Sequence, residues 1–200
     1  MIITFLIAIG FAKYRGCDIK IGFRSIALYP PIICEIAYLI LQIYVMNGDY
    51  DILIFADIFK KIYLLSFLFP IIMLKLYKPG LIGSAFVVIG TALNNWVMVA
   101  NNGKMPVFPT LTYLTGYVKS NTFERINDIH VLGNAGTQMI ILSDIFDVGW
   151  SILSIGDILI HLFAGIIVYS AIVELNKKKN KNFLLKPIIS KKYVDKNKNK

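Results

Sequence analysis

Long apolar stretches constrain the fold of this chain more than any other feature of its sequence. A helix needs about 20 consecutive, mostly apolar residues to cross the hydrocarbon core of a bilayer. Four stretches come close to this length, at 26–46, 62–77, 80–100 and 150–174, and a shorter fifth stretch covers 1–12. With 56% hydrophobic and only 16% charged residues, the chain is too apolar for an ordinary soluble domain. The sequence therefore predicts an all-α integral membrane protein, with a bundle of about five transmembrane helices.

The distribution of charge predicts how these helices are oriented. Residues 176–200 contain ten lysines and one aspartate, so this lysine-rich tail accounts for the whole net charge of +9. Segments 13–24 and 75–79 are also basic, whereas 47–61 and 101–149 contain more acidic than basic residues. Cytoplasmic loops of membrane proteins are enriched in Lys and Arg. We therefore expect a multi-pass protein of the cytoplasmic membrane, with its N-terminus outside and its C-terminus in the cytoplasm.

The distribution of charge also predicts which molecules the chain contacts. Besides the lipid bilayer itself, we expect anionic lipid head groups to contact the lysine-rich tail. The alternative is a solvated tail that only enforces the orientation of the last helix. Because the excess of basic residues is confined to the tail, no nucleic-acid-binding face is predicted.

The segment 101–149 is too long and too apolar for a plain connection between two helices. Structureless loops of more than about 12–15 residues are uncommon in compact proteins unless they are functional or disordered. We interpret this segment as a cap on the outer mouth of the bundle, containing a short interfacial or re-entrant helix.

Polar side chains interrupt the predicted helices mainly in their outer halves. Placing an ionisable residue inside a membrane costs free energy, so such a residue is first considered a candidate functional residue. One interpretation is a polar pocket open to the outside, and the other is hydrogen bonding between helices, which holds spans together. The residues concerned are Glu35, Gln42, Asn94, Asn95, Asp157 and His161.

No catalytic signature, metal site or cofactor motif is evident. Asp157 and His161 have the i, i+4 spacing of two metal ligands, and only His130 from the cap is at hand to complete a site. Zinc normally requires at least three protein ligands, so no metal is predicted. Cys17 and Cys34 have neither metal-ligand nor disulfide-framework spacing. The catalytic residues are unknown, no cofactor is implied, and an enzyme is the less favoured class.

The fourth apolar stretch ends in a helix stop followed by a distinctive motif. Gly103 suits the left-handed position after a helix, Lys104 complements the negative helix end, and Pro106 prevents continuation. The run from Asn101 to Val107 resembles the Asn-Gly-Gly-Arg-Met-Pro-Val motif of a family of small bacterial multi-pass membrane proteins, the domain of unknown function 5317. Here Asn102 stands where that family often has Gly, and Lys104 where it has Arg.

The resemblance covers most of residues 1–175, with its specific signal in 93–165. It implies a helical membrane fold and brings no known reaction with it. The other matching features are Leu93-Asn94, His130, Thr137, Asp144, Ser154-Ile155-Gly156-Asp157 and Gly165.

Three functional classes follow from these observations. The favoured hypothesis is binding or transport of a small amphiphilic ligand in an outer-facing polar pocket, with Lys104 meeting an anionic head group and His130 acting as a pH-dependent gate. The alternative is an accessory or structural subunit that docks on another membrane protein. A membrane-embedded enzyme, with His130 or His161 as base and Asp157 orienting it, is the least favoured. The predicted ligand-binding residues are Asn94, Asn95, Lys104, Met105, His130, Asp157 and His161.

Overall fold

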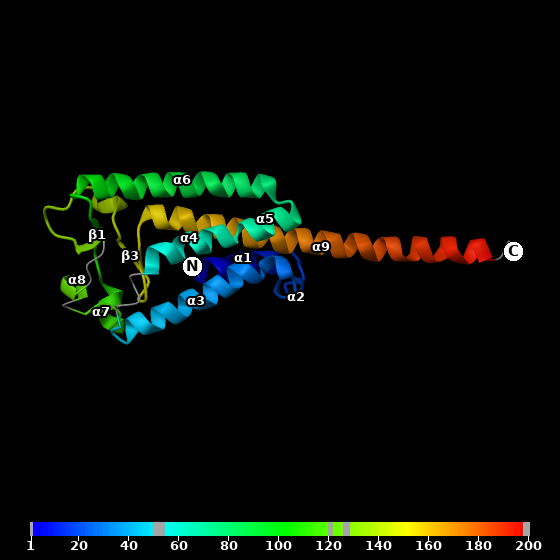
Figure 1. Ribbon diagram of the computed structural model, residues 1–200, viewed down its shortest axis with the longest axis horizontal. Coiled ribbons are helices and arrows are strands. Elements are labelled where there is room, and N and C mark those ends of the chain that lie inside the picture. Colours follow the sequence, from blue (N-terminus) through cyan, green and yellow to red (C-terminus); the bar gives the residue numbers. More distant parts are fainter. Residues whose placement is uncertain (1, 50–54, 120–121, 126–128, 198–200) are drawn as a thin grey trace.

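The computed structural model shows a bundle of helices that carries a cap of short elements at one end and lysine-rich turns at the other (Figure 1). It describes residues 2–49, 55–119, 122–125 and 129–197, and the side chains of the last helix as far as residue 180. Met1 at the start of the predicted first span, parts of the acidic segment and of the cap, and the last three residues of the lysine-rich tail lie outside the described residues.

The chain is mostly helical in this part. In chain order the elements are α1 (Ile2–Tyr14), α2 (Lys20–Phe23), η1 (Ile26–Leu28), α3 (Tyr29–Met46), α4 (Ala56–Ser66), α5 (Leu68–Leu74), α6 (Tyr77–Ala100), β1 (Met105–Val107), α7 (Leu111–Thr115), α8 (Thr122–Arg125), β2 (His130–Leu132), η3 (Ile140–Leu142), β3 (Phe146–Asp147), β4 (Ile152–Leu153) and α9 (Ile155–Asn197).

Three helical segments are long and apolar enough to cross a membrane: 26–46, 77–100 and 155–180. They make this a multi-pass membrane protein with its apolar helices in contact with lipid. The shorter α1 is also apolar. Its 13 residues rise only about 20 Å, which is less than the hydrocarbon core of about 30 Å. As a straight helix, α1 is therefore too short to cross that core alone.

The predicted third span, 62–77, is not one helix in the structure. The chain forms α4 and α5 instead, with a break at Phe67. Pro70 explains this break, because its ring clashes with the carbonyl of the residue four positions earlier, and that residue is Ser66, the last of α4. The last span also differs from its predicted bounds, because α9 begins at Ile155 and continues as helix into the lysine-rich tail.

The core of the bundle is built around Phe67, whose side chain is fully buried. Its ring lies 5.3 Å from that of Phe163 on α9 and 5.4 Å from that of Tyr63 on α4, both edge-on, and 6.1 Å from that of Phe5 on α1. Edge-to-face aromatic pairs at this distance are favourable beyond the area they bury. The break between α4 and α5 therefore places an aromatic side chain where three parts of the bundle meet.

The helices α6 and α9 form the most extensive contact and run side by side over most of α6 (Figure 1). Glycines allow this approach: a Cβ at Gly90 would overlap the Gly156 carbonyl oxygen, and one at Gly83 would lie 2.6 Å from the Phe163 ring. Small residues at helix interfaces allow close backbone contact in membranes, where van der Waals packing drives association.

At the lysine-rich end, the tail helix is fastened to the segment that follows α1. The Asn176 amide donates to the backbone carbonyl of Asp18 and accepts from its N–H, and the Lys179 ammonium lies 3.0 Å from the Asp18 carboxylate. The hydrogen bond from Lys179 lowers the pKa of Asp18 below its ordinary value. The basic segments at 13–24 and in the tail therefore lie at one end of the bundle, as their charge predicts.

The cap at the opposite end is not purely helical, and here the all-α prediction is wrong in detail. β1 pairs in parallel with β2, β3 pairs antiparallel with β4, and an isolated bridge joins Val107 to Asp144 on the other side of β1. These strands have only two or three residues each, too few for an alternating pattern to be visible in the sequence. The cap also contains two short helices, α7 and α8, where one short helix is predicted.

We predict that Gly156→Ala destabilises the protein, because the added Cβ overlaps both the Asn94 side chain and the Gly90 carbonyl. The free energy of unfolding should fall by about 1–3 kcal/mol, as for overpacked cores. Thermal unfolding in detergent measures this change. The matched control is Gly10→Ala on α1, where nothing lies within 4 Å of the added atom. Equal melting temperatures for the two variants would contradict the close crossing of α6 and α9.

Candidate functional site

A closed hydrogen-bond network joins α6 to the start of α9. The Ser154 hydroxyl accepts from the N–H of Asp157 at 2.9 Å, and the Asp157 carboxylate accepts from the N–H of Ser154 at 3.2 Å. This reciprocal pair is a capping box, which satisfies donors at the first turn of a helix. The Asn94 amide completes the network, because it donates to Asp157 at 3.0 Å and accepts from the Ser154 hydroxyl at 2.8 Å.

A second polar feature is a seam along one face of α3. Glu35, Tyr38 and Gln42 are spaced i, i+3, i+7, which places them on the same side of the helix. The Gln42 amide donates to the Trp150 carbonyl at 3.3 Å, and the Tyr38 hydroxyl lies within hydrogen-bonding reach of Ser151. The seam therefore begins against the segment that connects the cap to α9.

The deepest member of the seam is Glu35. It is 96% buried, since its exposed fraction is 4%, and the Tyr63 hydroxyl on α4 donates to its Oε2 at 2.6 Å. Its Oε1 is also buried and has no hydrogen-bond partner among the residues that the structure describes. Glu35 lies 11 residues from the end of α3 at Met46, roughly 16 Å along the helix and close to the middle of a bilayer.

The two remaining span residues of the predicted site lie apart from the Asn94 network. Asn95 is exposed, about 100° around α6 from Asn94 and next to the exposed Trp96. His161 is half-buried one turn deeper than Asp157 and close enough for Asp157 to act on it electrostatically. The structure therefore brings together Asn94 and Asp157, and leaves Asn95 and His161 outside the hydrogen-bond network among the described residues.

The motif after α6 forms the hinge between helix and cap. Asn102 and Gly103 have φ angles of 56° and 80°, both left-handed. Asn is among the few residues that tolerate this conformation, which accounts for an asparagine where the resembling motif has glycine. The Asn101 amide donates to the Gln138 carbonyl at 3.0 Å and accepts from the Gln138 N–H at 3.0 Å, which ties the cap to the end of α6.

The predicted cap residues gather around β1. The register pairs Met105, which is buried, with His130 on β2. The His130 Nε2 lies 3.7 Å from the buried Asp144 carboxylate, and the Asp144 N–H donates to the Pro106 carbonyl on the other side of β1. Lys104 is exposed directly before β1. Of the seven predicted residues, three thus gather in the cap, and Asn94 and Asp157 join α6 to α9.

Asp147 organises the cap in a way that the sequence did not reveal. Its carboxylate accepts hydrogen bonds from the N–H groups of Thr110, Thr112 and Gly149 at 2.6, 2.9 and 2.8 Å, and from the Thr112 hydroxyl at 2.8 Å. Burial on its own would raise the pKa of Asp147, but these hydrogen bonds together lower it below the ordinary value. Asp147 therefore caps the start of α7 from a distant part of the chain.

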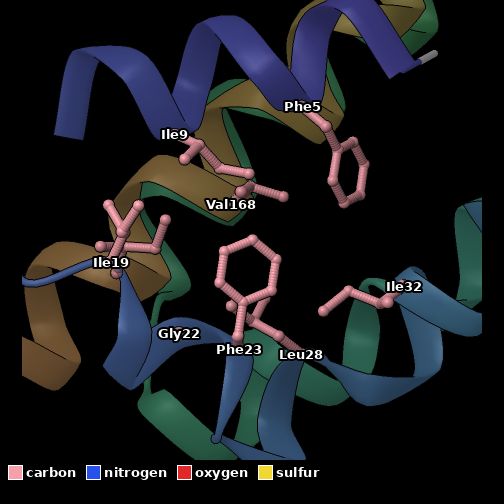
Figure 2. A pocket seen from close by; sticks show the side chains of 9 residues that line it. Phe5, Ile9, Ile19, Gly22, Phe23, Leu28, Ile32 and Val168 are labelled. Carbon is pink, nitrogen blue, oxygen red and sulfur yellow. The ribbon is translucent and has the colours of Figure 1, made fainter. Parts of the chain in front are cut away.

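An apolar cavity lies between α1, the α2–η1 segment and α9 (Figure 2). Figure 2 shows Phe5, Ile9, Phe23 and Val168 around it, and its volume is about 20 Å³. This is barely enough for one water molecule, which needs polar partners. The cavity is a packing defect and too small for a ligand. Among the described residues, no group of three or more His, Cys, Asp and Glu is arranged to hold a metal ion.

Sequence reasoning missed three residues that these contacts make important. Tyr38 and Tyr63 complete the seam around Glu35, and Asn101 fastens the cap. The i, i+3, i+7 spacing of Glu35, Tyr38 and Gln42 was a visible signal for the seam. No signal in the sequence pairs Tyr63 with Glu35, because the two residues are on different helices.

A helical bundle with three long apolar segments defines this chain as a multi-pass membrane protein. It belongs to a family of unknown function (DUF5317), whose match covers residues 20–169. This agrees with the resemblance carried by the motif at 101–107. No curated protein and no solved structure matches the chain.

We predict that Asn94→Ala destabilises the protein by about 1–2 kcal/mol, because it removes both hydrogen bonds between α6 and the capping box. The adjacent Asn95→Ala is the matched control, because Asn95 is exposed and outside the network. Thermal unfolding in detergent compares the two. If both variants unfold at the wild-type temperature, the network does not hold the helices together.

We predict that Asp147 makes the stability of the cap depend on pH. Because its pKa is lowered in the folded protein, its stabilising contribution is complete above the ordinary carboxyl value of about 3.9 and is lost as the pH falls through the lowered pKa. Asp147→Asn should therefore destabilise the cap at pH 7, by about 1–2 kcal/mol, and flatten its acid sensitivity. Tryptophan fluorescence during unfolding at pH 7 and at acidic pH measures this. A variant as acid-sensitive as the wild type would exclude Asp147 as the cause, and the exposed Asp49→Asn serves as control.

Proposed function

We propose that this protein binds or transports a small amphiphilic ligand, whose polar group enters the seam from the cap end of the bundle. The supporting observation is Glu35, a carboxylate in the middle of the bundle with one buried oxygen that lacks a hydrogen-bond partner among the described residues. An unsatisfied polar group in the hydrocarbon region costs several kcal/mol. Interhelical hydrogen bonding alone does not account for such an oxygen, whereas a ligand with a hydrogen-bond donor does.

The seam supports a route for that ligand. Gln42 and Tyr38 lie between Glu35 and the segment at Trp150 and Ser151, so polar groups continue from the cap towards the middle of the bundle. The chain of the ligand would lie among the apolar side chains of the helices.

The predicted site residues take two roles in this proposal. Asn94 and Asp157 hold the first turn of α9, and thereby the connection at 150–153 that borders the seam. Lys104 and His130 stand in the cap, where Lys104 would meet an anionic head group and His130 would gate the entrance, with Met105 beside it. Asn95 and His161 remain candidates for direct contact with the ligand.

The proposed orientation follows the charges of the two ends. The cap end carries the acidic segments and faces the outside, and the end with the lysine-rich turns and tail faces the cytoplasm. In this orientation the seam opens away from the cytoplasm.

The test is native mass spectrometry of the protein gently extracted from its own membrane, as wild type and as Glu35→Gln. We expect a defined small molecule on the wild type that is at least about tenfold depleted on the variant, since a hydrogen bond to a charged group contributes about 1.5–3 kcal/mol. Asp49→Asn is the control, because it neutralises an exposed carboxylate outside the seam. Bulk lipid alone, equal on all three proteins, would refute the proposal.

Tyr63→Phe provides a second variant if Glu35→Gln does not fold. It removes only the hydroxyl that donates to Glu35, so the bundle keeps its packing. We again expect less bound ligand on the variant than on the wild type.

One observation favours the accessory-subunit alternative. Asn95 exposes a polar amide on α6 between two exposed valines, Val88, which is 68% exposed, and Val99, which is 80% exposed. An amide facing lipid is better satisfied by a helix of another membrane protein. A stoichiometric second protein in the same spectra, absent with Asn95→Leu, would move the assignment to this class.

A further inference from the structure

A groove at the lysine-rich end of the bundle has no part in the proposed seam. It lies between the α5–α6 turn and α9, where Figure 1 shows α9 leaving the bundle, and its volume is about 550 Å³. This is within the range of about 300–1,000 Å³ typical of small-molecule sites. The lining residues are Leu74, Lys75, Leu76, Tyr77, Lys78, Pro79, Tyr169, Ser170, Val173, Glu174, Lys177 and Lys178.

The charge of this groove is strongly positive. Four lysines line it against a single acidic residue, Glu174, which lies 3.9 Å from the Lys177 ammonium. Lys75, Lys78 and Lys178 form no ion pair with any other residue that the structure describes. The groove is therefore suited to an anion, and phosphate groups are anions that lysine commonly binds.

The backbone of the turn brings these lysines together. Lys75 ends α5 in the left-handed conformation, with a φ of 58°, and α6 begins at Tyr77 only two residues later. Side chains other than glycine adopt this conformation rarely. The sharp reversal places Lys75 and Lys78 beside the stretch of α9 that carries Lys177 and Lys178, which are more than 90 positions away in the sequence.

The groove has both an apolar wall and a positively charged wall, as the binding of a phospholipid requires. Leu74 and Leu76 are buried in the apolar core, Val173 is half-buried, and the lysines are exposed. Tyr77 and Tyr169 also line it, and tyrosine is enriched where a membrane protein passes the head-group layer. A water-soluble anion would use only the lysines, whereas a phospholipid uses both surfaces.

We propose that this groove binds the phosphate head group of one anionic phospholipid, with the acyl chains against the apolar wall. The proposal is independent of the seam at Glu35, because the two regions share no lining residue. It also differs from general attraction of the tail to a charged surface, since it requires a defined stoichiometry and the lysines of the α5–α6 turn.

The test is native mass spectrometry of the full-length, delipidated protein titrated with phosphatidylglycerol or with phosphatidylcholine. We expect one phosphatidylglycerol to bind selectively, and Lys75→Gln/Lys78→Gln to weaken its binding by about tenfold or more. The matched control is Lys13→Gln/Lys20→Gln, which removes the same charge from exposed lysines outside the groove. The control pair should bind as the wild type does.

Three results would overturn the proposal. Equal weakening by both pairs of substitutions would show diffuse attraction to the positive end, and equal binding of the two lipids would show no recognition of charge. Full displacement of the lipid by millimolar inorganic phosphate would identify a site for free phosphate. If the turn variant does not fold, Lys177→Gln/Lys178→Gln replaces it, because both lysines are exposed on α9 and, among the described residues, Lys177 pairs only with Glu174 of the same helix.

Discussion

The close approach of the α6 and α9 backbones at Gly90 and Gly156 determines much of this structure. Side chains at these positions would separate the helices, and the hydrogen bonds of Asn94 with Ser154 and Asp157 would then be out of reach. Those bonds fix the first turn of α9, and hence the connection at 150–153 that contacts α3 through Gln42. The position of the cap over the bundle therefore depends on a helix crossing at which both helices carry glycine.

Two kinds of polar residue occur inside this bundle, and their hydrogen bonds distinguish them. Both carboxylate oxygens of Asp157 accept hydrogen bonds from Asn94 and Ser154, so helix packing is a sufficient explanation for its presence. Glu35 has only Tyr63 as a partner, on one of its two oxygens, among the described residues. For this reason the proposed ligand site lies deeper and closer to α3 than the sequence alone suggested.

How much of the structure the sequence predicts depends on whether each feature is specified locally or by contacts between distant segments. The apolar stretches at 26–46 and 80–100 identify helices because lipid requires an apolar surface along a continuous segment. The stop at Gly103 was also predictable, because left-handed backbone favours glycine locally. The break at Phe67 was readable from Pro70 and was missed. In contrast, the capping of α7 by Asp147 and the contact between Glu35 and Tyr63 join distant segments, and nothing local in the sequence specifies them.

The helix α9 connects the two ends at which we place ligand and lipid. It begins in the capping box beside the seam, packs along α6 and α1, and carries Lys177 and Lys178 into the groove at the other end. Its lysine-rich end is tied to Asp18 through Lys179 and Asn176. Both proposed sites therefore border the same helix, one beside its first turn and the other where it leaves the bundle.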